Sequence, residues 1–199
     1  NRSSCRNQSH IKMQDNYSNF KQELGEKIKA AADYYPDFPR PGVNFMDLFS
    51  ITSKPELFKE VNEATIKVLD QELGKDSFNV IVGLESRGFI QGTILAQHYQ
   101  VPFLPIRKSG KLPGECYTIE YGTEYSKDKV QIQKNALKPG SKVLLIDDLL
   151  ATGGTLEAGE KLISLIPDVE VVGSFCLFDI PFLKGSEKLE KKVVTIAKL

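Results

Sequence analysis

Two adjacent carboxylates followed by a turn rich in glycine and hydroxyl groups form the most informative chemical pattern of the chain. The apolar run 143–146 leads to Asp147 and Asp148 and then to the turn 151–155. A helical pattern follows, so backbone N–H groups would gather at a helix N-terminus, which favours a bound anion. The carboxylates would repel that anion but suit hydroxyl groups or a divalent cation nearby. A sugar phosphate satisfies both parts of the pattern.

The turn combines close backbone approach with hydroxyl donors. Its glycines let the backbone approach a phosphate, and its threonines add side-chain donors. The five residues of the turn are Ala151, Thr152, Gly153, Gly154 and Thr155. Because side chains alternate along a strand, we expect the backbone to bend at Asp147 and Asp148 if both carboxylates contact one ligand.

Other glycine-containing turns fit this stretch less well. A Walker A loop needs a lysine after its second glycine, and Thr155 stands there instead. The dinucleotide fingerprint needs a different glycine spacing and an acidic residue at a later strand end. An ordinary strand whose aspartate caps the next helix is the remaining alternative, and it requires charge, hydroxyl and glycine positions to coincide by accident.

A second strand-to-helix turn, residues 83–88, carries a guanidinium. Its backbone N–H groups and the bidentate side chain of Arg87 suit pyrophosphate. A hydrolase nucleophile elbow on Ser86 is excluded, because Leu84 occupies a position that requires glycine. Basic residues after the next strand would add positive charge, with a solvated basic turn as the alternative. The residues predicted to bind pyrophosphate are Glu85, Ser86, Arg87, Arg107, Lys108 and Lys111.

Length and composition favour one α/β domain with a small-molecule partner. The chain has 199 residues, 41% of them hydrophobic, which is enough for a substantial core. Lys plus Arg and Asp plus Glu both number 26, so no overall basic field would attract nucleic acid. Three cysteines and two histidines favour reduced thiols and oxygen ligands for any metal. We expect a cytoplasmic protein without a membrane partner, because no apolar run approaches the length of a membrane span.

Hydrophobic periodicity predicts strands that alternate with helices. Residues 1–16 lack periodicity and are expected to be a disordered extension before a single domain over 17–199. The expected helices are 17–32, one beginning at about Pro55, 88–99 and 155–166, and the expected strands are 79–84, 103–106, 142–147 and 169–178. This order predicts a mostly parallel central sheet flanked by helices, with ligands at the carboxyl ends of the strands. Residues 108–133 interrupt the order and are typical of a lid.

Residues 143–155 resemble the phosphoribosyl pyrophosphate (PRPP) signature of the type I phosphoribosyltransferases. That signature is a hydrophobic strand, two acidic residues and a Thr-Gly-Gly-Thr-like turn. Further segments resemble the adenine-specific branch of this family and occur in the same order along the chain. These segments are 36–43, 83–89, 107–114 and 120–122. The resemblance implies the type I phosphoribosyltransferase fold, with a hood at about 34–50 and a flexible lid loop.

The resemblance also implies a reaction and residue roles. Adenine and PRPP would give AMP and pyrophosphate in purine salvage, with Mg²⁺ bound through PRPP and water near the acidic pair. The acidic pair would contact the ribose hydroxyls, turn 151–155 the 5′-phosphate, and turn 83–88 pyrophosphate. The family often has a cis peptide in that second turn, which we expect between Glu85 and Ser86.

The hood and the lid would act on the base. The resemblance implies that Phe45 stacks on adenine, and that the main chain of Asn44 and Met46 reads its Watson–Crick edge. Glu120 would hydrogen-bond adenine N7 as a general acid, and Tyr121 would help to close the lid. The resemblance further implies a homodimer in which Arg107 reaches the site of the partner subunit.

Two other functions remain open at this point. A phosphoribosyltransferase for xanthine, guanine or orotate would share the PRPP site and differ in its hood. A PRPP-sensing regulator would keep the site without catalysis, and it should carry a nucleic-acid-binding module or a basic face, for which the charge balance gives no sign.

Overall fold

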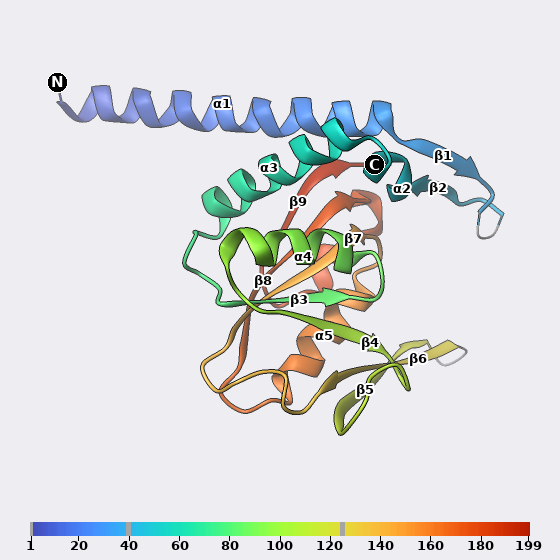
Figure 1. The fold of residues 1–199 in the computed structure, drawn as a ribbon. Helices are drawn as coiled ribbons and strands as arrows, with labels where there is room; N and C mark the ends of the chain where they lie inside the picture. Colours follow the sequence, from blue (N-terminus) through green and yellow to red (C-terminus); the bar gives the residue numbers. More distant parts are fainter. Residues whose placement is uncertain (1, 39–40, 124–125) are drawn as a thin grey trace. The chain divides into compact units, whose positions relative to one another are not determined.

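The computed structural model describes residues 2–38, 41–123 and 126–199 of the chain (Figure 1). It divides into two compact units, Asn1–Val61 and Asn62–Leu199, which are described separately below. The single domain expected over residues 17–199 stays a prediction. No helix in the described ranges is both long enough and apolar enough to cross a membrane.

The first unit contains a long helix and a small hairpin. Its elements are α1 (Arg2–Ala31), β1 (Asp33–Pro36), β2 (Asn44–Asp47), α2 (Leu48–Thr52) and the first turns of α3 (Pro55–Glu72). Strands β1 and β2 pair antiparallel. Asp47 caps α2, because its carboxylate accepts the Phe49 N–H at 2.9 Å. Leu24 and Ile28, one turn apart on α1, are both buried, so one face of this helix is covered.

Helix α1 differs from the expectation for the N-terminal residues. It begins at Arg2 rather than Tyr17, so residues 2–16 are helical where we expected disorder. The physical reason lies in what the segment lacks, because residues 2–16 contain neither proline nor glycine to interrupt a helix that continues from residue 17. An amphipathic pattern is therefore not needed for this segment to be helical.

The second unit is built on a seven-stranded sheet. Its order is β5-β6-β4-β3-β7-β8-β9. The five strands β4, β3, β7, β8 and β9 pair in parallel with their neighbours in this order. The bounds are β3 (Val80–Leu84), β4 (Phe103–Lys108), β5 (Cys116–Thr123), β6 (Ser126–Gln133), β7 (Lys142–Leu150), β8 (Glu170–Asp179) and β9 (Val193–Lys198). The mostly parallel sheet predicted from the sequence is confirmed.

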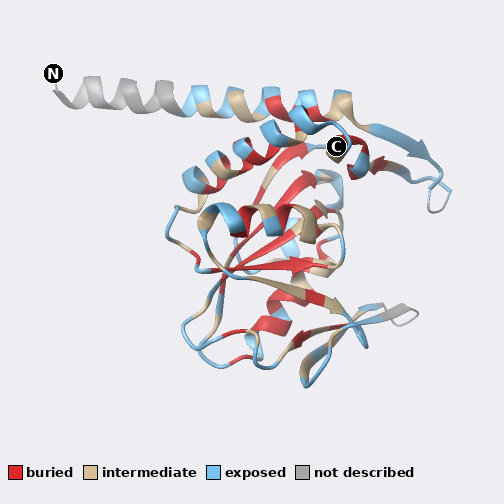
Figure 2. Cartoon of the chain, viewed as in Figure 1, coloured by how far each residue is buried: buried red, intermediate tan, exposed pale blue. Residues whose placement is uncertain are grey.

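Helices cover both faces of this sheet. On α4 (Gly88–Tyr99), Gly92 lies against the side chain of Ile81 in β3. On α5 (Gly154–Ser164), Gly159 lies against the side chain of Leu84, which points to the opposite face of the same strand. Strand β3 is buried along its whole length as a result, which explains its unbroken run of apolar residues (Figure 2).

The predicted lid, residues 108–133, forms a hairpin that joins the sheet. Strand β5 pairs with β6, and β6 pairs antiparallel with the end of β4, where Lys108 lies opposite Val130. Tyr117 and Ile119 pack against the core. The base of the lid is therefore part of the sheet, a pairing that periodicity did not predict.

The last segment of the chain was also not predicted. After β8, the short helices η1 (Pro181–Leu183) and η2 (Gly185–Lys188) lead to β9, which pairs in parallel with β8. Glu160 on α5 holds this segment in place. Its buried carboxylate accepts the N–H groups of Glu190 at 2.9 Å and Lys191 at 3.2 Å.

We expect Glu160→Gln to destabilise the protein by about 1–3 kcal/mol, because the amide replaces one acceptor oxygen with a donor that faces a backbone N–H. Urea denaturation measures this change. The control is Glu157→Gln on the same helix, whose pair with Lys161 is more exposed and should contribute less than about 0.5 kcal/mol. A Glu160→Gln protein as stable as the control would contradict the expectation.

Candidate functional site

The predicted site residues of the second unit come together at the carboxyl ends of the parallel strands. Strand β3 lies between β4 and β7, with Leu84 opposite Ile106 and Gly83 opposite Ile146. The three segments that follow these strands therefore emerge side by side (Figure 1). This arrangement is the usual place for ligands in an open α/β sheet.

The acidic pair lies within β7 rather than after it. The strand continues to Leu150, and its register with β8 places Asp147 opposite Cys176 and Leu149 opposite Phe178. The expected bend is thus not an interruption of the strand. Instead, the Asp147 carboxylate turns along the chain, and its Oδ1 accepts the N–H of Asp148 at 2.9 Å.

The two aspartates differ in their surroundings. Asp148 is 7% exposed, and its Oδ2 lies 2.5 Å from Nε of Arg87. Burial raises the pKa of Asp147 well above its ordinary value, and the neighbouring charge of Asp148 raises it further, whereas Arg87 acts in the opposite direction. One carboxylate is therefore held by a cation, and the other is reluctant to ionise.

The turn after β7 has the conformation that an anion site needs. Gly153 is the N-cap of α5 and has φ of 79°, in the left-handed region that favours glycine. In the described part of the chain, no side chain caps this helix through a hydrogen bond. The first N–H groups of α5, from Gly154 onward, have no intrahelical acceptor and point out of the helix N-terminus. They are available to a phosphate.

The second turn joins β3 to α4. The peptide bond between Glu85 and Ser86 is cis, which confirms the expectation for this turn. Gly88 begins α4 directly against β7, and a Cβ atom there would lie 2.3 Å from the carbonyl oxygen of Ile146. Only glycine allows this approach, and it brings the two turns to neighbouring positions.

An ion pair links the second turn to the acidic pair in β7. Arg87 comes from the second turn, and its partner Asp148 comes from the acidic pair, 61 residues away in the sequence. This pair places a guanidinium beside the segment predicted to bind ribose phosphate. A doubly anionic group bound at the second turn would lie within reach of the same cation.

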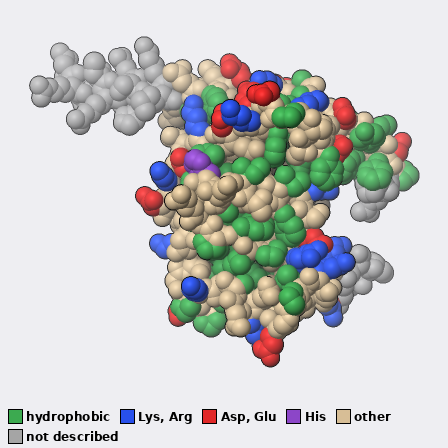
Figure 3. Space-filling view, viewed as in Figure 1, with side chains coloured by type: hydrophobic (Ala, Val, Ile, Leu, Met, Phe, Trp, Pro, Cys, Tyr) green, Lys and Arg blue, Asp and Glu red, His purple; other side chains and the backbone are tan. Residues whose placement is uncertain are grey.

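Glu85 organises the basic residues at the end of β4. Its carboxylate accepts hydrogen bonds from Arg107 Nε at 3.3 Å and Nη2 at 3.1 Å, and from the Lys108 N–H at 2.8 Å. Burial alone would raise the pKa of Glu85, but Arg107, the Lys108 N–H and the charge of Lys111 lower it overall. Figure 3 shows basic side chains gathered over this end of β4. Glu85 thus holds the Arg107 guanidinium and the Lys108 backbone beside the second turn, and its predicted place at pyrophosphate stays a prediction.

The lid hairpin reaches the turn 151–155. Tyr121 on β5 lies close to the side chain of Thr155, and burial, followed by the charge of Asp128, raises the pKa of its phenol. Glu120 lies opposite Lys129 in the hairpin register, with its Oε2 at 3.6 Å from Nζ of Lys129. The described lid therefore has its tyrosine at the turn and its glutamate in an exposed ion pair.

Comparison with known proteins identifies the family. The model of the phosphoribosyl transferase domain matches residues 49–197. The chain belongs to this family. It is 45% identical over 168 residues to an adenine phosphoribosyltransferase of Ruminiclostridium cellulolyticum, covering 84% of this chain and 94% of the relative.

Solved structures agree with this assignment. The adenine phosphoribosyltransferase of Saccharomyces cerevisiae, in complex with an imino-altritol bisphosphate and adenine, is similar with a TM-score of 0.82 and 38% identity, covering 87% of this chain and 98% of that chain. The enzyme of Trypanosoma brucei, in complex with AMP, pyrophosphate and ribose-5-phosphate, has a TM-score of 0.76 at 27% identity, covering 88% and 79%. The expected type I phosphoribosyltransferase fold is confirmed.

The predicted hood residues of this phosphoribosyl transferase lie in the first unit. Phe45 is half-buried and packs edge-on against Phe38, with ring centroids 5.1 Å apart. Asn44 is exposed, whereas the Met46 side chain is 9% exposed and belongs to the core. A buried Met46 side chain suits a residue that would use only its main chain, and the base contacts stay a prediction.

The oxygen ligands that this phosphoribosyl transferase offers fit a metal cation that is bound mainly through the substrate of the enzyme. Among the described residues, no group of three or more His, Cys, Asp or Glu could hold a metal ion by itself. Asp147 and Asp148 offer carboxylate oxygens, but Arg87 already occupies one of them. Mg²⁺ commonly binds one or two carboxylates together with substrate phosphates and water, so the residues present fit that mode.

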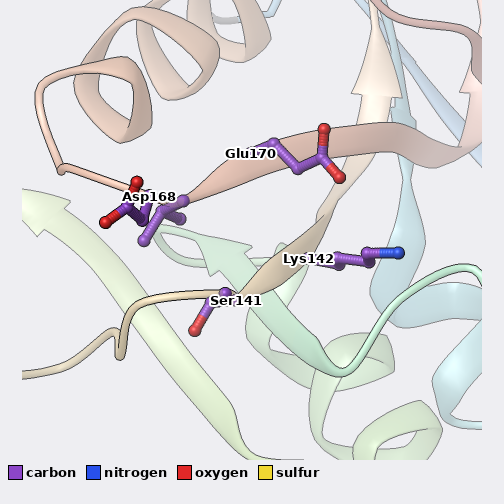
Figure 4. Close-up of a pocket in the computed structure, with 6 residues that line it drawn as sticks. Ser141, Lys142, Asp168 and Glu170 are labelled. Atoms are coloured by element: carbon purple, nitrogen blue, oxygen red, sulfur yellow. The ribbon is translucent and has the colours of Figure 1, made fainter.

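A surface cavity of about 340 Å³ lies away from this edge of the phosphoribosyl transferase sheet. Its lining residues are Gly140, Ser141, Lys142, Asp168, Val169 and Glu170, at the amino ends of β7 and β8. Figure 4 shows Lys142 and Asp168 pointing in opposite directions, so the charged groups do not converge on a ligand. None of the predicted site residues lines it.

One segment that touches the turn 151–155 was not predicted from the sequence. Gly185, at the start of η2, packs its backbone against Ala151 and Gly153. A glycine after the last predicted strand was the only available signal, and a single glycine does not show which part of the fold it approaches.

Proposed function

We propose that this chain transfers the 5-phosphoribosyl group of PRPP to N9 of adenine, giving AMP and pyrophosphate in purine salvage. The observation that carries the proposal is the neighbouring position of two strand-to-helix turns, with Arg87 of the second turn paired to Asp148 in the strand that leads to the first. One turn suits a phosphate monoester and the other suits a diphosphate, as in a single PRPP molecule. Relatives named adenine phosphoribosyltransferase and structures holding adenine or AMP support adenine as the base.

Ribose 5-phosphate would bind at the first turn. The N–H groups at the start of α5 and the hydroxyls of Thr152 and Thr155 would hold the 5′-phosphate. Asp147 and Asp148 would accept hydrogen bonds from the ribose hydroxyls, which fixes the sugar relative to the attacking base. Tyr121 would help to close the lid over the bound substrate.

Pyrophosphate would depart along the second turn. The N9–C1′ bond forms while the bond from C1′ to the pyrophosphate oxygen breaks; pyrophosphate takes the electron pair, and the proton that the attacking purine carried on its ring nitrogen passes to water. The backbone of Ser86 and the side chain of Arg87 would stabilise the departing charge, together with the basic residues anchored by Glu85. When bound, Mg²⁺ would supply further charge neutralisation on the pyrophosphate oxygens.

The base would be held by the hood and the lid. Phe45 would stack on adenine, and the main chain of Asn44 and Met46 would distinguish a 6-amino from a 6-oxo group. Glu120 would hydrogen-bond N7 as a general acid, which requires it to leave Lys129 when the lid closes.

A homodimer and a cytoplasmic location are further parts of the proposal. Arg107 contacts its own chain through Glu85 and the Lys111 carbonyl, and we propose that it also reaches the site of a partner subunit. Full activity of a monomer in active-enzyme sedimentation would contradict that role.

The experiment that tests the function measures AMP formation from PRPP, Mg²⁺ and adenine, with hypoxanthine, guanine, xanthine and orotate as competing bases. We expect AMP and pyrophosphate in equal amounts, and little product from the other bases. Faster turnover of an oxo-purine or orotate would assign the chain to another base. PRPP binding without product from any base would favour the PRPP-sensing regulator.

The raised pKa of Asp147 predicts where activity is lost on the acidic side of the pH dependence of kcat/KM. Its ionised form accepts the sugar hydroxyls, so kcat/KM for PRPP should fall as pH decreases through a pKa above that of an ordinary aspartate. Asp148→Asn removes the neighbouring negative charge, lowers the pKa of Asp147 and should move this acidic limb to lower pH. A limb that stays in place or moves to higher pH in this variant would contradict the assignment.

A further inference from the structure

The segment after β8 lies directly against the turn 151–155. We define the C-terminal strap as residues 180–191, which include η1 and η2. A Cβ atom built on Gly185 would lie 2.3 Å from the carbonyl oxygen of Ala151 and 2.9 Å from the amide nitrogen of Gly153. A Cβ atom on Gly153 would in turn lie 2.2 Å from the carbonyl oxygen of Gly185. The strap and the turn thus meet backbone to backbone.

The two glycines are required for different reasons. Gly153 has φ of 79°, so its backbone conformation alone favours glycine. Gly185 is not among the glycines with positive φ. An alanine at residue 185 would therefore meet no conformational penalty of that kind, and the obstacle is the space occupied by Ala151 and Gly153.

The strap is anchored on both sides of this contact. The Ile180 N–H donates to the Leu150 carbonyl at 2.9 Å, directly before the turn. At the other end, Glu160 accepts the N–H groups of Glu190 and Lys191, and Leu189 packs against the core. An added methyl group at Gly185 would consequently be relieved by movement of the turn rather than by release of the strap.

We propose that Gly185 is a positioning residue for the 5′-phosphate site, and that the C-terminal strap sets the orientation of the amides in turn 151–155. This inference rests on the proposed function, because it assumes that the turn binds a phosphate monoester. It adds a residue that contacts no ligand and acts only through the backbone of Ala151 and Gly153.

The test compares two ligands in a Gly185→Ala variant of the full chain. Ribose 5-phosphate presents the monoester and the diol, whereas magnesium pyrophosphate would occupy the second turn. We expect the Kd for ribose 5-phosphate to rise about tenfold, the effect of about one weakened charge-assisted hydrogen bond. The Kd for pyrophosphate should stay within about twofold, and KM for PRPP should rise with little change in kcat.

The matched control is Gly173→Ala on β8. A Cβ atom there would lie 3.1 Å from the Lys192 carbonyl oxygen and 3.2 Å from the Leu73 side chain, so it is also crowded, but not against the turn. The control should lose some thermal stability and keep both affinities. Equal weakening of both ligands in Gly185→Ala, unchanged binding of ribose 5-phosphate, or the same selective loss in Gly173→Ala would overturn the proposal.

A measurement on the unmodified protein decides the question if Gly185→Ala does not fold. Hydrogen exchange of the strap amides, including Ile180, should slow when ribose 5-phosphate binds and stay unchanged with pyrophosphate. Unchanged exchange in the strap with ribose 5-phosphate bound would overturn the role of the strap. If the unmodified protein binds no ribose 5-phosphate, the proposed function fails; if it binds and the variant binds equally well, only the role of Gly185 fails.

Discussion

Replacing both Asp147 and Asp148 by alanine should reduce kcat/KM for PRPP at least about 10³-fold, equivalent to about 4 kcal/mol of transition-state stabilisation. The variant loses the acceptors proposed for the ribose hydroxyls, and it leaves Arg87 without the carboxylate that holds it. Both losses act on the position of C1′ between the base and pyrophosphate, where small displacements have large effects on rate.

Steady-state kinetics with saturating adenine measures this effect. The control is Asp76→Ala, which removes an exposed carboxylate from the loop before β3 and should leave the kinetics unchanged. Thermal unfolding of both variants separates a catalytic loss from a folding defect. AMP formation within a few-fold of the unmodified protein would rule out the acidic pair as the ribose site.

Glu120→Gln should lower kcat about 10²- to 10⁴-fold, the range expected for loss of a general acid, with PRPP affinity nearly unchanged. The reason is the separation of the groups, because Glu120 lies on β5, whereas the proposed PRPP contacts lie on β7, α5, the second turn and the basic segment 107–111. Single-turnover kinetics together with PRPP binding distinguishes the two effects.

A matched control for Glu120 exists in the same hairpin. Glu115 forms an exposed pair with Lys134 at 3.2 Å, comparable to the pair of Glu120 with Lys129. Glu115→Gln should leave kcat unchanged. If Glu120→Gln turns over at the rate of this control, Glu120 has no part in the proton transfer.

The sequence predicted that the site lies at the carboxyl ends of the strands, because unbroken apolar runs are typical of buried parallel strands. Strands covered on both faces, such as β3, need no polar alternation, and the turns at their carboxyl ends necessarily meet. The strand-to-helix turn at 151–155 was predictable from the local sequence, and the cis peptide between Glu85 and Ser86 from the family resemblance.

Contacts between distant segments were not predictable in the same way. The pair of Arg87 with Asp148 and the contact of Gly185 with Gly153 depend on the packing of β3, β7 and the strap. The helical state of residues 2–16 was missed for another reason, because periodicity reports a buried face and not helix formation itself. Pattern reasoning finds elements and their ends, whereas tertiary packing decides which ends touch.

A crystal structure of the protein with AMP bound tests the central claim most directly. We expect the 5′-phosphate on the amides that begin α5, the ribose hydroxyls on Asp147 and Asp148, and the base against Phe45. AMP bound elsewhere, or with its phosphate on the second turn and its sugar away from the two aspartates, would contradict the account.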